Sequence, residues 1–398
     1  MKIGIDARPL QGETLYRGIG KSLEKLLRAM IPLYGATNEF IFYVDRGLPV
    51  PDIARQFPAY RTIAVASPKL GKKRYFRSFM RSYKAAKPLK KDVDIFLLYD
   101  ADLGVPGGSV PVVTIFHDAI PLLFRGTEPK GHATGIRKSK NALASNVYWR
   151  KYLRTLAQYK KSSAILAISE SSKRDFQKYV GGIDAQDIYV VPHGVEYKAA
   201  GGRVSGKIKK MATGQYLLYV GGIDIRKNII GLADTFFELK ADYPKLRLFT
   251  IGKEFGLNDQ LKDLGWASKL EEHKEFADDV ISPGFLSDAD LAYMYEHAAA
   301  FLFPSRYEGF GLPVLEAFQA GCPVVAYTNS SIPEVAGDAA LLIDDGAPMA
   351  PTVKKLLSDN KLRNSLVRKG HIQAKKFSYA QTAKCTFEVL QTVYNKSR

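Results

Sequence analysis

Two glutamates stand eight positions apart in the stretch SRYEGFGLPVLEAFQAGCPVVA, which covers residues 305–326. Between Glu308 and Glu316 lie Gly309 and Gly311, whose small size lets backbone amides approach a bound ligand. The apolar run after Gly311 predicts a helix, and a helix N-terminus favours an anion. Carboxylates beside such a site suit hydroxyl groups, so the stretch predicts a ligand with both hydroxyl groups and negative charge. The alternatives are a pair of carboxylates acting as acid and base, and an ordinary strand–turn–helix segment.

A second turn, YVGGIDIRKN at residues 219–228, follows an apolar strand-like run. Gly221 and Gly222 end the run, and Arg226 and Lys227 can neutralise phosphate, the first as a bidentate donor and the second as a point charge. The spacing is not that of a Walker loop. Two basic residues that open a solvated helix are the alternative. Two phosphate-competent turns in one half of the chain favour a diphosphate ligand.

The first half of the chain offers weaker candidates. His117 and Asp118 end the apolar run VVTIFHD, and the carboxyl end of a buried strand is where ligands bind in open α/β sheets. A structural histidine is the alternative. Gly18 and Gly20 in YRGIGKSLEKLL precede a helix-like run, and they form either an anion-binding turn or a tight loop.

Two Asp-x-Asp pairs resemble pairs that bind a divalent metal ion together with a nucleotide diphosphate. They are Asp92 and Asp94 in KDVDIF, and Asp100 and Asp102 in YDADLG. Each pair is more typical of a strand cap or a solvated turn, so we expect no metal site.

Short apolar runs alternate with helix-like segments along the chain, which predicts two α/β domains with parallel sheets. The glycine-rich, basic segment 196–215 separates two such series and is interpreted as a linker or loop. We therefore expect domains at 1–198 and 199–376, two Rossmann-like folds that face a central cleft. The last segment, 377–398, is expected to be a helix.

Positive charge is concentrated in one half of the chain. Residues 1–200 hold 33 Lys/Arg and 17 Asp/Glu, a balance of +16, whereas the rest of the chain contributes only +2. Residues 68–91 contain ten basic residues and no acid, with aromatic residues at helical spacing, which favours an anionic membrane surface. Residues 136–163 add eight more basic residues. The alternatives are a basic face over packed aromatics and a nucleic-acid surface, although no nucleic-acid motif is present. The proposed membrane contacts are Lys72, Lys73, Arg74, Phe76, Arg77, Phe79 and Arg81.

Together these motifs resemble glycosyltransferase family 4, whose members are retaining enzymes with the two-domain GT-B fold. The resemblance covers nearly the whole chain. It rests on IDARPL, YRGIGKSL, FHDAIPLLF, AISESSKRDF, VVPHGVE, YVGGIDIRKN, SPGFLSDADLAYMYEHAAAFLFPSRYEGFGLPVLEAFQAGCPVVA and FSYAQTA. The Glu-x7-Glu motif in its glycine and proline context is the most specific element, and the pattern is similar to the polysaccharide mannosyl- and rhamnosyltransferase branch.

The resemblance implies a nucleotide-sugar donor in the second domain, with Glu308 on a sugar hydroxyl and Glu316 on the ribose. Arg226 and Lys227 would stabilise the departing diphosphate, and His117 would line the cleft on the acceptor side. Further donor contacts would come from Gly309, Phe310, Gly311, Leu312, Gly222 and Leu286, and acceptor or phosphate contacts from Gly18, Gly20 and Asp118. Many relatives carry arginine where this chain has Gly222, and Arg226 would take over that phosphate contact.

The expected activity is transfer of a hexose or deoxyhexose from a nucleotide-diphosphate sugar to a glycan acceptor. The acceptor is expected to be linked to a lipid, and the reaction to serve the synthesis of a cell-surface polysaccharide or glycolipid. No cofactor or metal is expected. The alternatives are an enzyme of the same fold with a soluble acceptor or epimerase activity and, with less support, a nucleic-acid-binding module. Two cysteines and no signal-peptide or membrane-spanning pattern indicate a cytoplasmic protein, associated with the inner face of the plasma membrane.

Overall fold

Contacts divide the chain, described here by a computed structural model, into two compact units. Unit 1 consists of residues 1–119, 141–194 and 378–398, and unit 2 of residues 120–140 and 195–377. The structure describes residues 1–11, 18–45, 48–56, 61–65, 92–101, 109–124, 142–196, 202–252, 255 and 265–398.

In the described part of unit 1, seven parallel strands form a sheet in the order β3-β2-β1-β4-β5-β6-β7. Their bounds are β1 Lys2–Asp6, β2 Glu39–Asp45, β3 Arg61–Val65, β4 Ile95–Leu98, β5 Val112–Phe116, β6 Ala164–Ala167 and β7 Ile188–Val190. The central strands β4, β5 and β6 are buried along their whole length, as expected for parallel strands that are covered on both faces.

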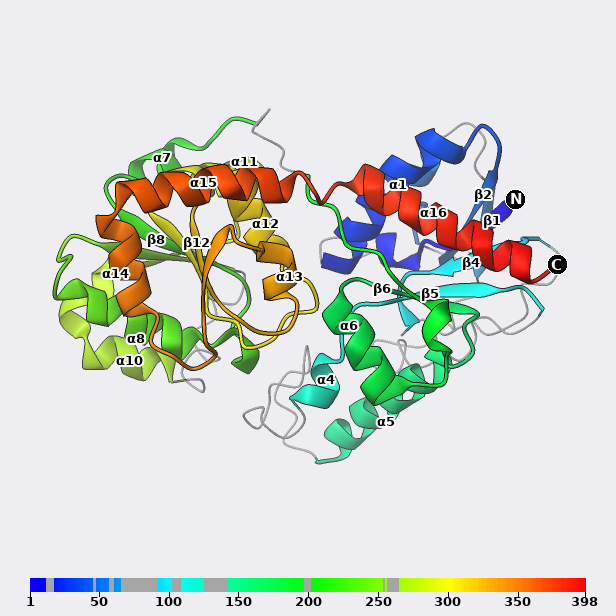
Figure 1. Ribbon diagram of the computed structural model, residues 1–398, viewed down its shortest axis with the longest axis horizontal. Helices are drawn as coiled ribbons and strands as arrows, with labels where there is room; N and C mark the ends of the chain where they lie inside the picture. The colour runs from blue at the N-terminus through cyan, green and yellow to red at the C-terminus, as the bar shows by residue number, and fades with distance from the viewer. Residues whose placement is uncertain are drawn as a thin grey trace. The chain divides into compact units, whose positions relative to one another are not determined.

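Helices cover both faces of this sheet, with α1 and α16 on one side and α5 and α6 on the other (Figure 1). The rings of Tyr34 and Phe387 stack with centroids 3.7 Å apart, which joins α1 to the C-terminal helix. The helical elements are η1 Arg8–Leu10, α1 Gly18–Tyr34, α2 Asp52–Arg55, α5 Ala142–Tyr159, α6 Glu170–Asp175, η4 Phe176–Val180, η5 Ala185–Asp187 and α16 Tyr379–Lys396.

Unit 2 contains a second parallel sheet, with six strands among its described residues in the order β10-β9-β8-β11-β12-β13. Their bounds are β8 Tyr216–Val220, β9 Arg247–Ile251, β10 Val280–Gly284, β11 Ala300–Phe303, β12 Val324–Tyr327 and β13 Ala340–Ile343. The sheet lies between α15 on one side and α8 and α10 on the other (Figure 1). The helical elements are α4 Ile120–Leu123, α7 Gly206–Met211, η6 Ile225–Lys227, α8 Ile229–Lys240, α10 Trp266–Glu272, η8 Lys274–Asp279, α11 Asp288–His297, α12 Leu312–Gln319, α13 Ile332–Ala336, α14 Ala350–Ser358 and α15 Asn360–Ala374.

The predicted α/β class with two parallel sheets is confirmed. The interpretation of residues 196–215 as linker or loop is wrong for residues 206–211, which form α7. The hydroxyl oxygen of Ser205 accepts a hydrogen bond from the amide of Ile208 and caps this helix, and the Ile208 side chain is buried. This six-residue helix has one buried residue, so its sequence lacks the apolar periodicity by which a helix is predicted.

Candidate functional site

An ion-pair cluster lies at the carboxyl edge of the unit 2 sheet. Lys227 Nζ is 2.5 Å from Oε1 of Glu308, and Arg226 Nη1 is 2.8 Å from Oε2 of the same carboxylate. Arg226 Nε contacts Asp224 Oδ1 at 2.9 Å. Lys227 and Glu308 are 7% and 8% exposed, so this cluster sits at the margin of the protein interior. The structure thus brings together three residues that the sequence placed in two separate turns.

The charge state of Glu308 follows from its two cationic neighbours. Burial alone would raise the pKa of this carboxyl group, but the charges of Lys227 and Arg226 outweigh burial and lower the pKa to about 2. Glu308 is therefore ionised at neutral pH. The sequence analysis did not foresee this arrangement, in which both cations contact Glu308 directly.

The loop that carries Glu308 is held by a segment after β12 that the sequence analysis did not select. Ser330 Oγ accepts a hydrogen bond from the amide of Glu308 at 2.8 Å. The Ser331 hydroxyl group contacts the carbonyl oxygens of Glu308 and Phe310 at 3.0 and 2.8 Å. Asn329 Nδ2 donates to the carbonyl oxygen of Ser305 at 3.0 Å. The run TNSSIP, which places four short polar side chains directly after a buried strand, is the signal that could have identified this clamp.

Gly311 and the start of α12 supply the backbone geometry expected from the sequence. Gly311 has φ +108°, a conformation that disfavours any side chain, and a Cβ atom there would lie 2.8 Å from Ile332 Cδ1. The helix begins at Leu312 with Pro313 in its first turn, as predicted. Gly309 and Phe310 are buried in the same loop. The amides at this helix start therefore lie in the loop that carries Glu308.

Backbone hydrogen bonds tie the Arg226 turn to the Glu308 loop. The amide of Arg306 donates to the carbonyl oxygen of Arg226 at 2.7 Å, and Arg226 Nη1 donates to the carbonyl oxygen of Tyr307 at 3.0 Å. The Tyr219 hydroxyl group donates to the carbonyl oxygen of Gly222 at 2.6 Å, which fixes the turn after β8. The cations and the carboxylate are thus held by one rigid pair of loops.

The remaining predicted donor residues lie elsewhere in the same unit. Glu316, on α12, accepts a hydrogen bond at Oε2 from the hydroxyl group of Tyr295 at 3.3 Å. Burial and the charge of Glu316 raise the pKa of Tyr295 well above its usual value, so this hydroxyl group remains a donor. Leu286 is half-buried just after β10, and its neighbour Phe285 is 76% exposed.

His117 follows β5 in unit 1, and its ring orientation is well defined. Its Nε2 lies 2.9 Å from the carbonyl oxygen of Tyr99. The Ser172 hydroxyl group donates to the backbone carbonyl oxygen of His117 at 2.9 Å. Its ring stacks on that of His193, with centroids 6.0 Å apart and an interplanar angle of 26°. Burial lowers the pKa of His117, which favours the neutral ring. Asp118 is half-buried beside it.

The glycines of the predicted acceptor loop open α1, which begins at Gly18 and contains Gly20. A Cβ atom at Gly18 would meet nothing within 4 Å, so packing does not require glycine at this position. Residues 12–17, which precede the helix, lie outside the described residues.

A buried ion pair at the end of β1 escaped the sequence analysis. Arg8 donates to both carboxylate oxygens of Asp6, at 2.7 and 2.6 Å, and both side chains are buried. Burial opposes the charge of Arg8, but Asp6, Asp45 and Asp100 together raise its pKa. The pair lies within the motif IDARPL, which the resemblance includes, and fixes the chain where it leaves the sheet.

In the first Asp-x-Asp pair, Asp94 acts as a strand cap and Asp92 makes a surface ion pair. Asp94 Oδ2 accepts a hydrogen bond from the amide of Lys2 at 2.7 Å, and Asp92 contacts Arg61 at 3.6 Å on the surface. Within the described ranges, no cluster of three or more histidine, cysteine or acidic residues is arranged to hold a metal ion. Asp102 and the proposed membrane contacts at 72–81 lie outside the described residues. No helix in the described part of the chain combines the length and apolar character needed to span a bilayer.

Two family models match the chain, one on each half. Residues 18–198 match the model described as Glycosyltransferase Family 4, and residues 204–373 match the model described as Glycosyl transferases group 1. Among curated proteins, the serotype-specific mannosyltransferase WbdA of Escherichia coli is 27% identical over 98% of this chain and 48% of its own length. The O-antigen chain mannosyltransferase B of Escherichia coli is 35% identical over 44% of each protein. The chain thus spans about half the length of these curated relatives.

Solved structures of low sequence identity share the fold. Sucrose-phosphate synthase from Thermosynechococcus elongatus superposes with a TM-score of 0.71 at 15% identity, over all of both chains. Anabaena HepE, solved in complex with UDP-glucose, gives a TM-score of 0.67 at 16% identity over 98% of this chain and 100% of its own. WaaG, a glycosyltransferase involved in lipopolysaccharide biosynthesis, gives 0.66 at 15% identity over 98% and 99% of the two chains.

Proposed function

Because this chain belongs to the family 4 glycosyltransferases and has their GT-B fold, we propose that it transfers a sugar from a nucleotide donor to a glycan acceptor. The sugar is a hexose or deoxyhexose, and the anomeric configuration is retained. Mannose is the first sugar to test, because WbdA and the O-antigen chain mannosyltransferase B are named mannosyltransferases. The acceptor is a glycan of a surface polysaccharide or glycolipid, carried on a lipid.

The observation that carries this proposal is the contact of Glu308 with both Lys227 and Arg226 beside the first turn of α12. Two cations and the amides of a helix start suit a diphosphate. A carboxylate at the same place suits a sugar hydroxyl group. A nucleotide-diphosphate sugar can use all three features, because it places its phosphates and its sugar side by side.

Donor binding requires an exchange of partners in this cluster. The phosphate oxygens of the donor replace the carboxylate on Lys227 and Arg226, and Glu308 then accepts hydrogen bonds from the sugar. Glu316 accepts hydrogen bonds from the ribose hydroxyl groups at the other end of the donor. The two glutamates therefore select the donor by its hydroxyl groups, while the cations hold its charge.

The cations also act on the reaction itself. Breaking the bond between the sugar and the diphosphate increases the negative charge on the leaving oxygen, and fixed cations at that position stabilise the transition state. Asp224 and the backbone carbonyl oxygen of Tyr307 hold the Arg226 guanidinium group in position, so this cation needs little reorganisation. Front-face attack by the acceptor hydroxyl group accounts for retention without a covalent intermediate, and no metal is assigned a role.

We propose that unit 1 binds the acceptor and contacts an anionic membrane at the cytoplasmic face. On α5 and just beyond it, Arg150, Leu153, Arg154 and Lys160 are exposed at helical spacing, and Leu153 is 46% exposed. Each basic side chain near an anionic surface contributes about 1 kcal/mol at modest salt, and an exposed leucine can enter the interface. These basic residues belong to the segment 136–163, which the sequence analysis identified as basic.

Incubation of the purified protein with a panel of nucleotide sugars tests the donor assignment. We expect slow hydrolysis of one donor and loss of turnover in Glu308→Ala and Lys227→Ala. Turnover that survives both substitutions would refute the site. Release of an isomerised sugar nucleotide without any acceptor would instead identify an epimerase.

Co-sedimentation with vesicles tests the membrane assignment. We expect the protein to bind vesicles that contain phosphatidylglycerol. Combined Arg150→Glu and Arg154→Glu substitution should weaken this binding. Equal binding to purely zwitterionic vesicles, or a clear preference for nucleic acid over anionic vesicles, would count against it.

A further inference from the structure

A buried polar cluster behind His117 joins four segments of unit 1 that are distant in sequence. The Ser22 hydroxyl group on α1 lies 2.6 Å from the Tyr99 hydroxyl group and 3.1 Å from Nδ1 of His193. The Tyr379 hydroxyl group on α16 contacts the same Ser22 oxygen at 3.5 Å. Ser22 therefore connects Tyr99, which directly follows β4, with His193 in the segment after β7 and with the C-terminal helix.

His117 is bound to this cluster at two points. Its Nε2 lies 2.9 Å from the Tyr99 carbonyl oxygen, and its ring stacks on His193. A carbonyl oxygen only accepts hydrogen bonds, so Nε2 must carry the proton. In the neutral ring, Nδ1 is then the acceptor nitrogen. Ser22 thus contacts the hydroxyl group of Tyr99, and His117 contacts its backbone carbonyl oxygen.

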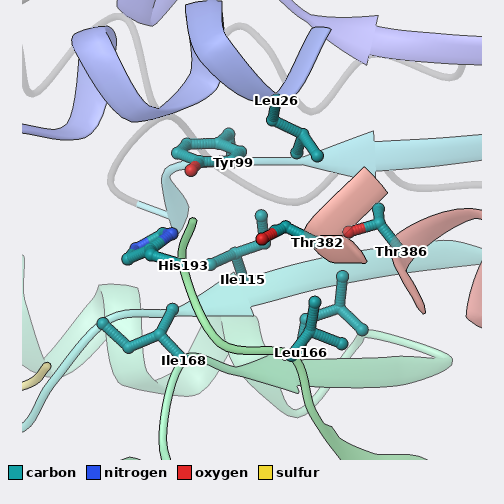
Figure 2. Close-up of a pocket in the computed structure, with 9 residues that line it drawn as sticks. Leu26, Tyr99, Ile115, Leu166, Ile168, His193, Thr382 and Thr386 are labelled. Carbon is teal, nitrogen blue, oxygen red and sulfur yellow. The ribbon is translucent and has the colours of Figure 1, made fainter. Parts of the chain in front are cut away.

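The surroundings of His193 favour a neutral and tightly held ring. His193 is 6% exposed, and burial together with its neighbour His117 lowers its pKa to about 3. A small cavity adjoins the His193 ring. Its volume is about 10 Å³, counted as the space that the centre of a water molecule can occupy. Figure 2 shows that Thr382 and Thr386 enter this cavity beside His193, Tyr99 and Leu26.

We propose that His193 is a positioning residue for His117. Stacked on the His117 ring and tied to Tyr99 through Ser22, it holds His117 with Nε2–H on the Tyr99 carbonyl oxygen and with Nδ1 as the acceptor. This rests on the proposed function in one respect, because an acceptor nitrogen held in place suits a substrate hydroxyl group. The orientation itself is a property of unit 1 alone.

Nitrogen-15 NMR of the imidazole rings tests the orientation without any substrate. The His117 signals are assigned with a His117→Gln variant. In the wild-type protein at pH 7.5, we expect a protonated Nε2 and an unprotonated Nδ1. His193→Ala should shift both signals towards a mixture of tautomers, and His193→Phe, which keeps a ring to stack on, should restore them at least halfway. A protonated Nδ1 in the wild-type protein, or unchanged signals in His193→Ala, would overturn the proposal.

Thr386→Val is the matched control, because it changes the same cavity from α16 without touching His117, and we expect unchanged His117 signals. A shift as large as that of His193→Ala would show that any disturbance of the cavity moves His117, and would overturn the assignment to His193. If His193→Ala does not fold, Ser22→Ala takes its place, with broadened His117 signals expected and unchanged signals refuting the proposal.

Kinetics separate this proposal from the proposed function. With the donor that the wild-type enzyme uses, His193→Ala should lower kcat at least tenfold and leave the donor KM within twofold, and His193→Phe should recover part of kcat. An unchanged kcat in His193→Ala would overturn the positioning role while leaving the enzyme assignment intact. A wild-type protein that uses no donor would refute the proposed function, whereas the NMR result would still decide the orientation of His117.

Discussion

Nζ of Lys227 lies 2.5 Å from Oε1 of Glu308, so a cation suited to phosphate already has an anionic partner. Arg226 binds the other oxygen of the same carboxylate at 2.8 Å. One glutamate thus occupies the two cations that the sequence assigns to a diphosphate. An incoming diphosphate competes with this internal carboxylate for the same donors, which has measurable consequences for binding and for stability.

Glu308→Gln should strengthen the binding of a nucleoside diphosphate and weaken sugar transfer. The amide keeps the size of the side chain but removes the charge that competes for Lys227 and Arg226. We expect a dissociation constant about tenfold lower for the preferred diphosphate, equivalent to about 1.4 kcal/mol. Transfer should fall by about 100-fold or more, because a contact at the reacting sugar is lost.

Titration calorimetry with UDP, GDP and dTDP measures the first effect. Glu316→Gln is the matched control, since this glutamate pairs with Tyr295 rather than with the cations. We expect it to weaken diphosphate binding, because a partner for the ribose is lost. Weaker binding in Glu308→Gln as well would contradict a competition between carboxylate and phosphate.

Acid should remove the stabilisation that Glu308 provides. Its pKa in the folded protein is about 2, below its ordinary value of 4.5. A depressed pKa stabilises the fold above the unfolded-state value, and this contribution is lost as the pH falls from about 4.5 towards 2. The full difference corresponds to roughly 3 kcal/mol. Urea denaturation between pH 7 and pH 3 should show a smaller loss of stability in Glu308→Gln than in the wild type. Parallel curves for the two proteins would argue against an ionised, paired Glu308.

The elements of both sheets could be predicted from the sequence, because strand formation depends on short local runs of apolar residues. The same holds for α12, whose Pro313 and Gly311 mark its start locally. The sequence singled out Glu308, Arg226 and Lys227 by residue type in two glycine-rich turns. Their mutual contact was not foreseen, because it joins positions 81 residues apart and depends on how β8 and β11 pair within the sheet.

Polar contacts between distant segments account for what the sequence did not reveal. Ser330 and Ser331 hold the Glu308 loop through hydroxyl groups that leave no periodic signal. Ser22 and His193 lie 171 residues apart in the chain and meet only after the sheet and α1 have assembled. Such contacts depend on tertiary structure, and residue type alone does not single out one serine among many.

Gly311→Ala should destabilise unit 2 through two separable effects. A Cβ atom would lie 2.8 Å from Ile332 Cδ1, and the backbone has φ +108°. We expect a loss of about 2–4 kcal/mol from strain and overlap combined. Ile332→Val removes the Cδ1 atom, so the double variant should recover the part due to overlap and retain the part due to strain.

Chemical denaturation of the four proteins in this cycle measures both parts. Gly206→Ala is the control in the same unit, because a Cβ atom there meets nothing within 4 Å. It should leave stability within about 0.5 kcal/mol of the wild type. Full additivity of the Gly311 and Ile332 substitutions would show that the two side chains do not meet.

Gly194→Ala should loosen the packing of the C-terminal helix α16 against the rest of unit 1. A Cβ atom at Gly194 would overlap the amide nitrogen of Tyr379 and would lie 2.5 Å from the carbonyl carbon of Ser378. These are backbone atoms at the start of α16, so no side-chain rotation can relieve the overlap and the helix itself must move. We expect a loss of about 3 kcal/mol or more in the free energy of unfolding, because overpacking against a fixed backbone is costly.

Hydrogen exchange measures this loosening. It should accelerate along the whole of α16, including the amides near Thr382 and Phe387, and more than in β1 or β5. Gly18→Ala, where a Cβ atom meets nothing within 4 Å, is the control in unit 1 and should leave exchange in α16 unchanged. Since Tyr379 also contacts Ser22, the loosened helix should release the Ser22 hydroxyl group as well. Normal protection of α16 in Gly194→Ala would show that the contact between Gly194 and the helix start is not needed to hold the helix.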